Sequence, residues 1–186
     1  MRRLFLIAGL MLALGLAVLA ASAASANFGG TWVLDKTKSQ GLSQRMQGAD
    51  KVTWTITQDD KTISIDQKVE GGQPAGGGGG GGGGGNGGGG GPRPPAAPSA
   101  YKLDGSETTM DIPMGQATGK ATLKATWSGD ALELSRKTSF TTPDGDRTST
   151  NTQKLSLSGD GKVLTAVVHS EGGRGGPMDS TLVFNK

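Results

Sequence analysis

The segment from Gln116 to Trp127 constrains the fold of this chain more than any other, because its residues alternate between two kinds. The first kind is small or apolar and comprises Ala117, Gly119, Ala121, Leu123, Ala125 and Trp127. The second kind is threonine or lysine and comprises Thr118, Lys120, Thr122, Lys124 and Thr126. A period of two residues is typical of a β-strand with one face in the interior and one in water. Because the inward residues are mostly small, they either lie beneath other side chains or leave room for a bound molecule.

Shorter alternating segments continue this pattern through the rest of the chain. They lie at residues 28–34, 52–56, 63–69, 101–103, 108–112, 132–140, 147–157, 163–170 and 178–184. Connectors rich in glycine, aspartate, serine and proline separate them, and these residues supply the backbone angles and local hydrogen bonds of tight turns. Beyond the N-terminal apolar segment no helical period is present, and residues 35–49 allow a turn or two of helix at most.

The alternation predicts an all-β fold of eight to ten sequential antiparallel strands. A sheet of this length must bury its apolar face and protect its two edges. Closure into a single up-and-down β-barrel does both. A flattened sandwich of two packed sheets is the main alternative.

The N-terminal residues 1–26 have the three parts of a secretory signal peptide. Arg2 and Arg3 precede an apolar run at residues 4–20, and the small-residue triplet at 24–26 follows. This order predicts cleavage before Asn27 and a periplasmic or secreted bacterial protein. An uncleaved membrane anchor is the alternative, because the run approaches the roughly 20 residues that span a bilayer. We expect membrane contact only through this segment before cleavage.

Residues 71–98 interrupt the remaining domain, residues 27–186, with a glycine- and proline-rich segment. Glycine has the most backbone freedom to lose and no side chain to bury, so we expect a disordered loop. The roughly three strands before it are too few to be stable alone, which favours one domain. Lengthening a five-residue turn to about 28 residues costs only roughly 1.5 kcal/mol. The segment lacks the Gly-Lys-Ser/Thr end of a phosphate-binding loop.

The charge balance gives no indication of nucleic-acid binding. The chain has 19 Lys and Arg against 16 Asp and Glu, and two of the basic residues lie in the predicted signal peptide. The remainder therefore has 17 basic and 16 acidic residues, a net charge of about +1. Nucleic-acid binders usually cluster their basic residues in a stripe, whereas here lysine and aspartate are interspersed.

The start of the first predicted strand carries a motif that resembles a known superfamily. Gly30-Thr31-Trp32 looks like the Gly-x-Trp opening of lipocalins and fatty-acid-binding proteins. The longer string at residues 30–35, with Lys38-Ser39, is similar to the start of secreted bacterial lipocalin-like proteins, most of which have no assigned activity. The resemblance implies that Gly30 lets the chain bend and that Trp32 closes one end of a barrel.

The chain also departs from the fatty-acid-binding pattern. Those proteins typically hold a carboxylate with arginine and tyrosine on their last strands, whereas the last strand here reads Leu182-Val183-Phe184. Their two-helix lid is poorly matched too, because residues 40–48 are polar and include two glycines.

Arg136 is the leading candidate for a ligand-binding side chain. If Leu132 and Leu134 face inward, strand parity turns Arg136 inward as well. On the next strand, parity from Leu155 places Asn151 and Gln153 on the same face. An apolar pocket with a few convergent polar groups is the usual form of a small-molecule site. The alternative is that Arg136 lies at the rim, in water or paired with Asp146.

Trp54 and Trp127 are further candidates for the wall of a pocket, although large aromatic residues act by default as core. His169 is the only histidine in a chain without cysteine, and no carboxylates flank it at the spacing of metal ligands. We therefore expect no metal site and no cofactor. No nucleophile motif such as Gly-x-Ser-x-Gly is present, so nothing indicates an enzyme.

Together these features predict a monomeric, lipocalin-like barrel that binds a small hydrophobic or amphiphilic molecule without covalent chemistry. The alternative is a structural or protein-interaction module of the cell envelope whose core is filled by its own side chains.

Overall fold

The structure is a computed structural model of the 186-residue chain and describes residues 26–71, 99–114, 117–142, 145–172 and 176–186. The predicted signal peptide, except for Ala26, and residues 72–98 of the predicted loop lie outside the described residues. In chain order the elements are β1 Gly30–Leu34, α1 Gln44–Gly48, β2 Lys51–Gln58, β3 Thr62–Glu70, β4 Ser99–Lys102, β5 Thr108–Met114, β6 Ala117–Ser128, β7 Ala131–Thr142, β8 Gly145–Leu157, β9 Val163–Glu171 and β10 Met178–Asn185.

The ten strands form one antiparallel sheet in the order β4-β3-β2-β1-β10-β9-β8-β7-β6-β5. Neighbours in the chain are neighbours in the sheet, except that β1 pairs with β10 and that β4 and β5 form its two edges. The predicted all-β, up-and-down architecture is confirmed. The two separate sheets of a sandwich do not form, because all ten strands belong to a single hydrogen-bonded sheet.

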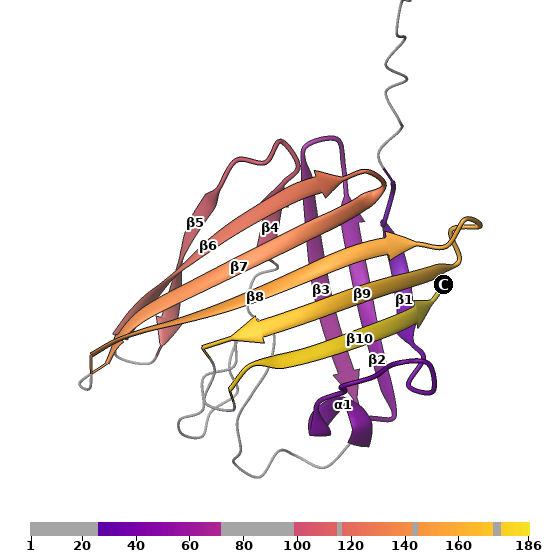
Figure 1. Cartoon of the computed structure of the whole chain (residues 1–186), viewed down its shortest axis with the longest axis horizontal. Coiled ribbons are helices and arrows are strands. Elements are labelled where there is room, and N and C mark those ends of the chain that lie inside the picture. The colour runs from indigo at the N-terminus through magenta and orange to yellow at the C-terminus, as the bar shows by residue number, and fades with distance from the viewer. Residues whose placement is uncertain (1–25, 72–98, 115–116, 143–144, 173–175) are drawn as a thin grey trace, which may run out of the picture.

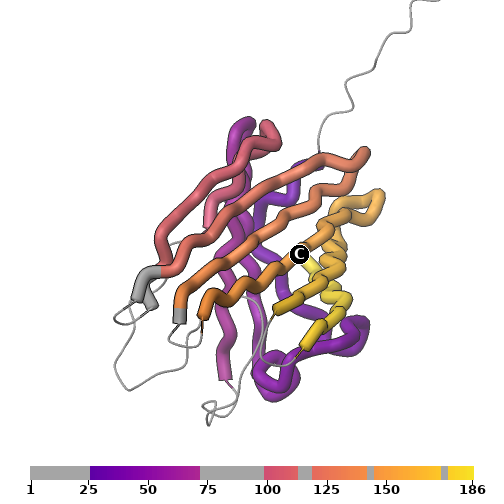
Figure 2. The backbone as a smooth tube through the Cα atoms, turned by 60° about the vertical axis from the view of Figure 1, so that its left-hand side comes forward, coloured from indigo at the N-terminus to yellow at the C-terminus, as the bar shows by residue number. Residues whose placement is uncertain are grey.

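This sheet curls until it is nearly closed into a barrel. Strands β5–β10 run obliquely across β1–β4 (Figure 1), and the second view shows the same two sides facing each other (Figure 2). The edge strands β4 and β5 are not hydrogen-bonded to one another, but β4 lies close to β6. The inward faces of all ten strands therefore surround a common interior.

Alternation in the sequence becomes alternation in burial. In β2, Val52, Trp54 and Ile56 are buried, while their neighbours along the strand are exposed or half-buried. Tight turns set this register, as in the β6–β7 connection, where Gly129 has a φ of 61°. A positive φ is readily accessible only to glycine, so the residue fits the turn that the sequence predicts there.

Two cross-strand rows of inward residues define the interior on the β5–β10 side. The apolar row runs through Trp127, Leu132, Leu155, Ala166 and Leu182. The polar row runs through Thr108, Leu123, Arg136, Asn151, Ser170 and Met178. The two rows are four residues apart along β7, which corresponds to roughly 13 Å along an extended strand.

The interior around the apolar row is filled by the protein's own side chains. Leu132, Leu155 and Ala166 have no exposed surface. Ala121 and Ala125, two of the small inward residues of β6, are also 0% exposed. These two residues of β6 therefore lie beneath other side chains instead of lining an empty cavity. Close packing of this kind is normal for a protein core.

Candidate functional site

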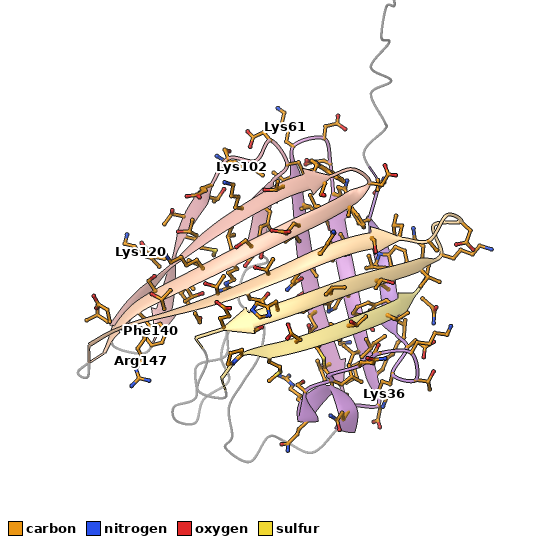
Figure 3. The ribbon with its side chains drawn as sticks, viewed as in Figure 1. Lys36, Lys61, Lys102, Lys120, Phe140 and Arg147 are labelled. Carbon is orange, nitrogen blue, oxygen red and sulfur yellow. The ribbon has the colours of Figure 1, made fainter. Side chains whose placement is uncertain are left out.

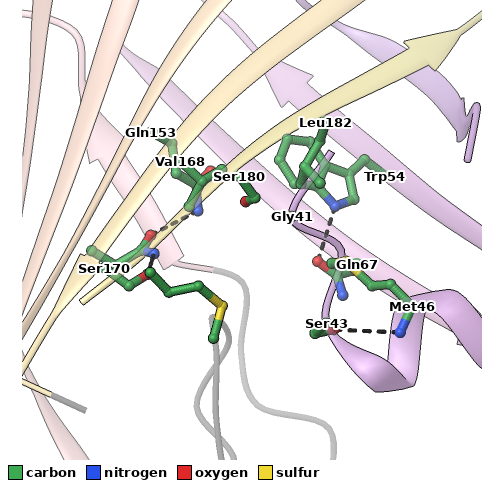
Figure 4. Close-up of a pocket in the computed structure, with 12 residues that line it drawn as sticks. Gly41, Ser43, Met46, Trp54, Gln67, Gln153, Val168, Ser170, Ser180 and Leu182 are labelled. Atoms are coloured by element: carbon green, nitrogen blue, oxygen red, sulfur yellow. Dashed lines mark hydrogen bonds between the residues drawn. The ribbon is translucent and has the colours of Figure 1, made fainter. Parts of the chain in front are cut away.

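A small pocket opens into the interior beside α1, and we call it the α1 pocket (Figure 4). It has a volume of about 50 Å³ and lies between α1, the β2–β3 hairpin and strands β8–β10. Its apolar wall includes Trp54 and Leu182, and its polar side includes Asn151, Gln153 and Ser170. None of the described residues that line it is charged. An apolar wall facing a few polar groups is the composition of a small-molecule site.

The polar side of the pocket is a chain of hydrogen bonds between side chains. Gln153 Nε2 donates to Asn151 Oδ1 at 3.0 Å, and Asn151 Nδ2 donates to Ser170 Oγ at 2.7 Å. Gln153 Oε1 is buried and accepts no hydrogen bond from the described residues. A buried acceptor without a partner costs free energy, so Gln153 is a position where a bound donor would be stabilising.

Trp54 forms the apolar wall from the opposite side of the barrel. Its indole Nε1 donates to Gln67 Oε1 at 3.0 Å, and its ring lies 4.4 Å, centroid to centroid, from that of Phe184. The register explains the first contact, because Trp54 and Gln67 are direct partners in the β2–β3 pair. Trp54 is thus held in place by packing and by a hydrogen bond at the pocket wall.

Helix α1 and its flanks cover one side of the pocket. Ser43 caps the helix by accepting a hydrogen bond from the Met46 backbone N–H, a common role for serine at a helix start. Lys36 Nζ donates to the carbonyl oxygen of Ala49 and ties the connection back to the end of β1. The side chains of Met46 and of Met178 both line the pocket. Methionine is flexible, so these two side chains can adapt to a guest.

Arg136 faces the interior, as strand parity predicts, but it does not line the α1 pocket. It is the register partner of Asn151, and its Nη1 donates to Ser99 Oγ, 3.4 Å away on the edge strand β4. Asp146, the alternative partner considered above, instead accepts a hydrogen bond from Thr141. Arg136 therefore lies beside the pocket and reaches across the interior.

Tyr101 lies on β4, the same edge strand as Ser99, and is close to Arg136 of β7. Burial raises the pKa of the Tyr101 hydroxyl, and the positive charge of Arg136 opposes that rise. The hydroxyl is therefore protonated at neutral pH and able to donate a hydrogen bond. Neither Ser99 nor Tyr101 is distinguishable from sequence as a site residue, because the edge strand β4 is short and follows the glycine-rich segment.

Trp127 lies away from the other predicted binding residues. It stacks on Phe28, with the ring centroids 6.1 Å apart, and does not line the α1 pocket. Trp32 is close by in the core, where its Nε1 donates to the Phe28 carbonyl oxygen and Lys186 Nζ lies 4.9 Å from its ring centroid. Gly30 has a φ of 133°, which favours glycine at the start of β1. Of the five predicted binding residues, the pocket brings together Trp54, Asn151 and Gln153.

Several residues of this region were not singled out by sequence reasoning. They are Gln67, Ser170, Ser180, Met46 and Met178 in the pocket, and Ser99 and Tyr101 beside Arg136. For the residues on strands, the alternation of the sequence predicts that they face inward. It does not show which strands face each other across a barrel. Met46 lies on a five-residue helix whose position depends on tertiary contacts.

His169 lies on the outer face, half-exposed between two carboxylates. Its Nδ1 is 2.5 Å from Asp179 Oδ1 and its Nε2 is 2.9 Å from Glu171 Oε1. The hydrogen bond with Glu171 and that with Asp179 raise the pKa of the imidazole. No group of His, Cys, Asp or Glu side chains among the described residues has an arrangement able to hold a metal ion.

Comparisons with known proteins do not identify the chain: no protein-family model and no curated protein matches it. Within the described ranges, no helix combines the length and apolar character needed to cross a membrane. The case for a function therefore rests on the barrel, the pocket and the residues around them.

Proposed function

We propose that this protein is a periplasmic or secreted lipocalin-like barrel that binds a small hydrophobic or amphiphilic molecule without covalent chemistry. The observation that carries the proposal is the α1 pocket, in which Trp54 and Leu182 face a polar side containing the unpartnered Gln153 Oε1. The curled up-and-down sheet supports the lipocalin-like assignment, as does the Gly30–Trp32 pair at its start.

The size of the pocket limits the ligand. Drug-sized ligands occupy pockets of about 300–1,000 Å³, and the α1 pocket has about 50 Å³. Only a small group enters it as it stands, and a larger guest has to displace Met46 and Met178. A bound molecule therefore occupies the mouth beside α1 and not the packed region around the apolar row.

A second function, a protein-interaction module with a self-filled core, is favoured by that same packing. Leu132, Leu155 and Ala166 of the apolar row have no exposed surface, and a barrel with a self-filled core acts through its outer surface or its edges. The edge strands β4 and β5 present backbone groups that a partner strand can pair with.

A neutral fluorescent probe, N-phenyl-1-naphthylamine, separates the two functions. If the pocket binds apolar molecules, the emission of the probe rises on mixing and saturates with one site per chain. The probe also raises the melting temperature, because a ligand that binds only the native state stabilises it by about 2.7 kcal/mol at one hundred times Kd. Neither response occurs in a protein with a self-filled core.

Two substitutions localise the binding. Ser180→Leu adds volume inside the pocket from β10 and is expected to weaken probe binding about tenfold, equivalent to roughly 1.4 kcal/mol. Ser156→Leu makes the same change on the outer face of β8 and serves as the matched control. Equal affinities for both variants and the unsubstituted protein would place the bound probe outside the α1 pocket.

A further inference from the structure

The barrel interior holds the positive charge of Arg136, which has no acidic partner among the described residues. Arg136 is half-buried on the inward face of β7, and its one hydrogen bond within the described residues goes to Ser99. The ion pairs among the described residues involve Lys38, Lys68, Lys120 and His169 and leave Arg136 out. Burying a charge is costly unless it is paired, so this arrangement favours the binding of an anion.

No carboxylate faces inward from the described strands. The register places Asp66, Glu133, Asp111 and Glu171 on the outer face, opposite to Ile65, Leu132, Met110 and Ser170. Arg147, the other inward arginine by parity, lies with its register partner Phe140 at the far end of the β7–β8 hairpin (Figure 3). Near Arg136, therefore, the described interior offers positive charge and no negative charge.

One hydroxyl group contacts the Arg136 guanidinium, and further hydroxyl groups face the same interior. Ser99 Oγ is 3.4 Å from Nη1, and Tyr101 is near enough for the charge of Arg136 to act on it. Thr108 lies in the same cross-strand row, two strands away, and its Oγ1 is buried and has no hydrogen-bond partner among the described residues. A guanidinium with neighbouring hydroxyl donors is the kind of group set that binds an oxyanion.

We propose that Arg136, with Ser99 and Tyr101, binds the oxyanion head of an amphiphile, a carboxylate or a phosphate monoester, whose apolar part extends toward the α1 pocket. Asn151 connects the two places, because it is the register partner of Arg136 and also lines the pocket. The inference rests on the proposed binding function and adds the chemical class of the ligand.

Calorimetric titration of the full chain with three eight-carbon probes tests this inference. Octanoate and octyl phosphate carry an oxyanion head, and octan-1-ol has a neutral hydroxyl in its place. At least one of the two anions is expected to bind about tenfold more tightly than the alcohol, because a hydrogen bond to a charged group is stronger than a neutral one. The more tightly bound anion identifies the head as carboxylate or phosphate.

Variants test whether Arg136 is responsible. Arg136→Gln is expected to remove the preference for the anion over octan-1-ol, whereas Arg136→Lys retains part of the preference. Lys137→Gln removes the same charge from the adjacent, outward-facing position and is the matched control. If Arg136→Gln fails to fold, Arg136→Lys and Tyr101→Phe provide the same comparison, with a smaller preference expected in each.

The outcomes separate failure of this inference from failure of the proposed function. If octan-1-ol binds as tightly as both anions, the inference is overturned and the pocket function stands. If none of the three probes binds, both are overturned. If Lys137→Gln weakens anion binding as much as Arg136→Gln, the effect arises from net charge and the Arg136 site is rejected.

Discussion

The apolar row and the polar row lie on the same strands but differ in packing and in hydrogen bonding. In the apolar row, leucines from β7 and β8 meet without exposed surface. In the polar row, four residues further along β7, Arg136 and Asn151 take the equivalent inward positions. The apolar row stabilises the barrel, whereas the polar row contains groups that the barrel itself does not fully satisfy. Natural proteins tolerate such local exceptions chiefly at functional sites.

Truncation of one side chain in each row is expected to give the largest difference in stability between the two rows. Leu155→Ala leaves a cavity in the packed region and is expected to lower the free energy of unfolding by about 2–5 kcal/mol. Ser170→Ala removes one hydrogen-bond acceptor beside the pocket and is expected to cost about 1 kcal/mol. Chemical denaturation of both variants measures the difference. Equal losses would mean that the two rows contribute alike to stability.

A substitution at the start of β1, next to the packed region, tests whether the backbone there requires glycine. Gly30→Ala forces a side chain onto a φ of 133° and is expected to cost about 1–2 kcal/mol. Gly159→Ala is the control, because a Cβ there meets nothing within 4 Å and the residue has no positive φ. If Gly30→Ala is as stable as Gly159→Ala by thermal unfolding, β1 does not require glycine.

One substitution in the polar row is expected to raise the free energy of unfolding, whereas the substitutions above lower it. Thr108→Val replaces a buried, unpartnered hydroxyl with a methyl group of similar shape and is expected to raise the free energy of unfolding by about 1 kcal/mol. Thr109→Val, on the exposed outer face of the same strand, is the matched control and should change little. A loss of stability in Thr108→Val alone would show that its hydroxyl is satisfied in solution.

The smallest expected effect is a pH dependence from the outer face, remote from both rows. The pKa of His169 is raised above its ordinary value of 6.5 by Glu171 and Asp179. Its stabilising contribution is therefore fully present below pH 6.5 and is lost as the pH rises through the raised value. Denaturation curves on both sides of this window should show the loss in the protein and not in His169→Gln. The same pH profile in the variant would assign the dependence to another group.

The fold was predictable to a large extent because a period of two residues indicates which side chains lie on the same face of a strand. Parity alone placed Arg136, Asn151 and Gln153 inward, and the structure finds them there. The need to bury one apolar face and to protect two edges favoured a single closed sheet over a two-sheet sandwich, and the single sheet is the one observed. Turn chemistry fixed the register, as at Gly129.

The site was less predictable, because it depends on which strands meet across the interior. Gln67 and Ser170 are about one hundred residues apart in the chain, and only the closure of the sheet brings them to one pocket. The same closure places Trp127 on Phe28 instead of in the pocket wall. It also covers Ala121 and Ala125, whose small size had allowed an open interior.

The most direct test of the central claim, that a ligand enters the polar part of the interior, is an NMR titration of the isotope-labelled protein with octanoate. The predicted result is a set of saturable shifts in the side-chain amide signals of Asn151 and Gln153, with the backbone signals of Leu132 and Leu155 unchanged. Shifts confined to the outer face, or no shifts at saturating octanoate, would contradict the account.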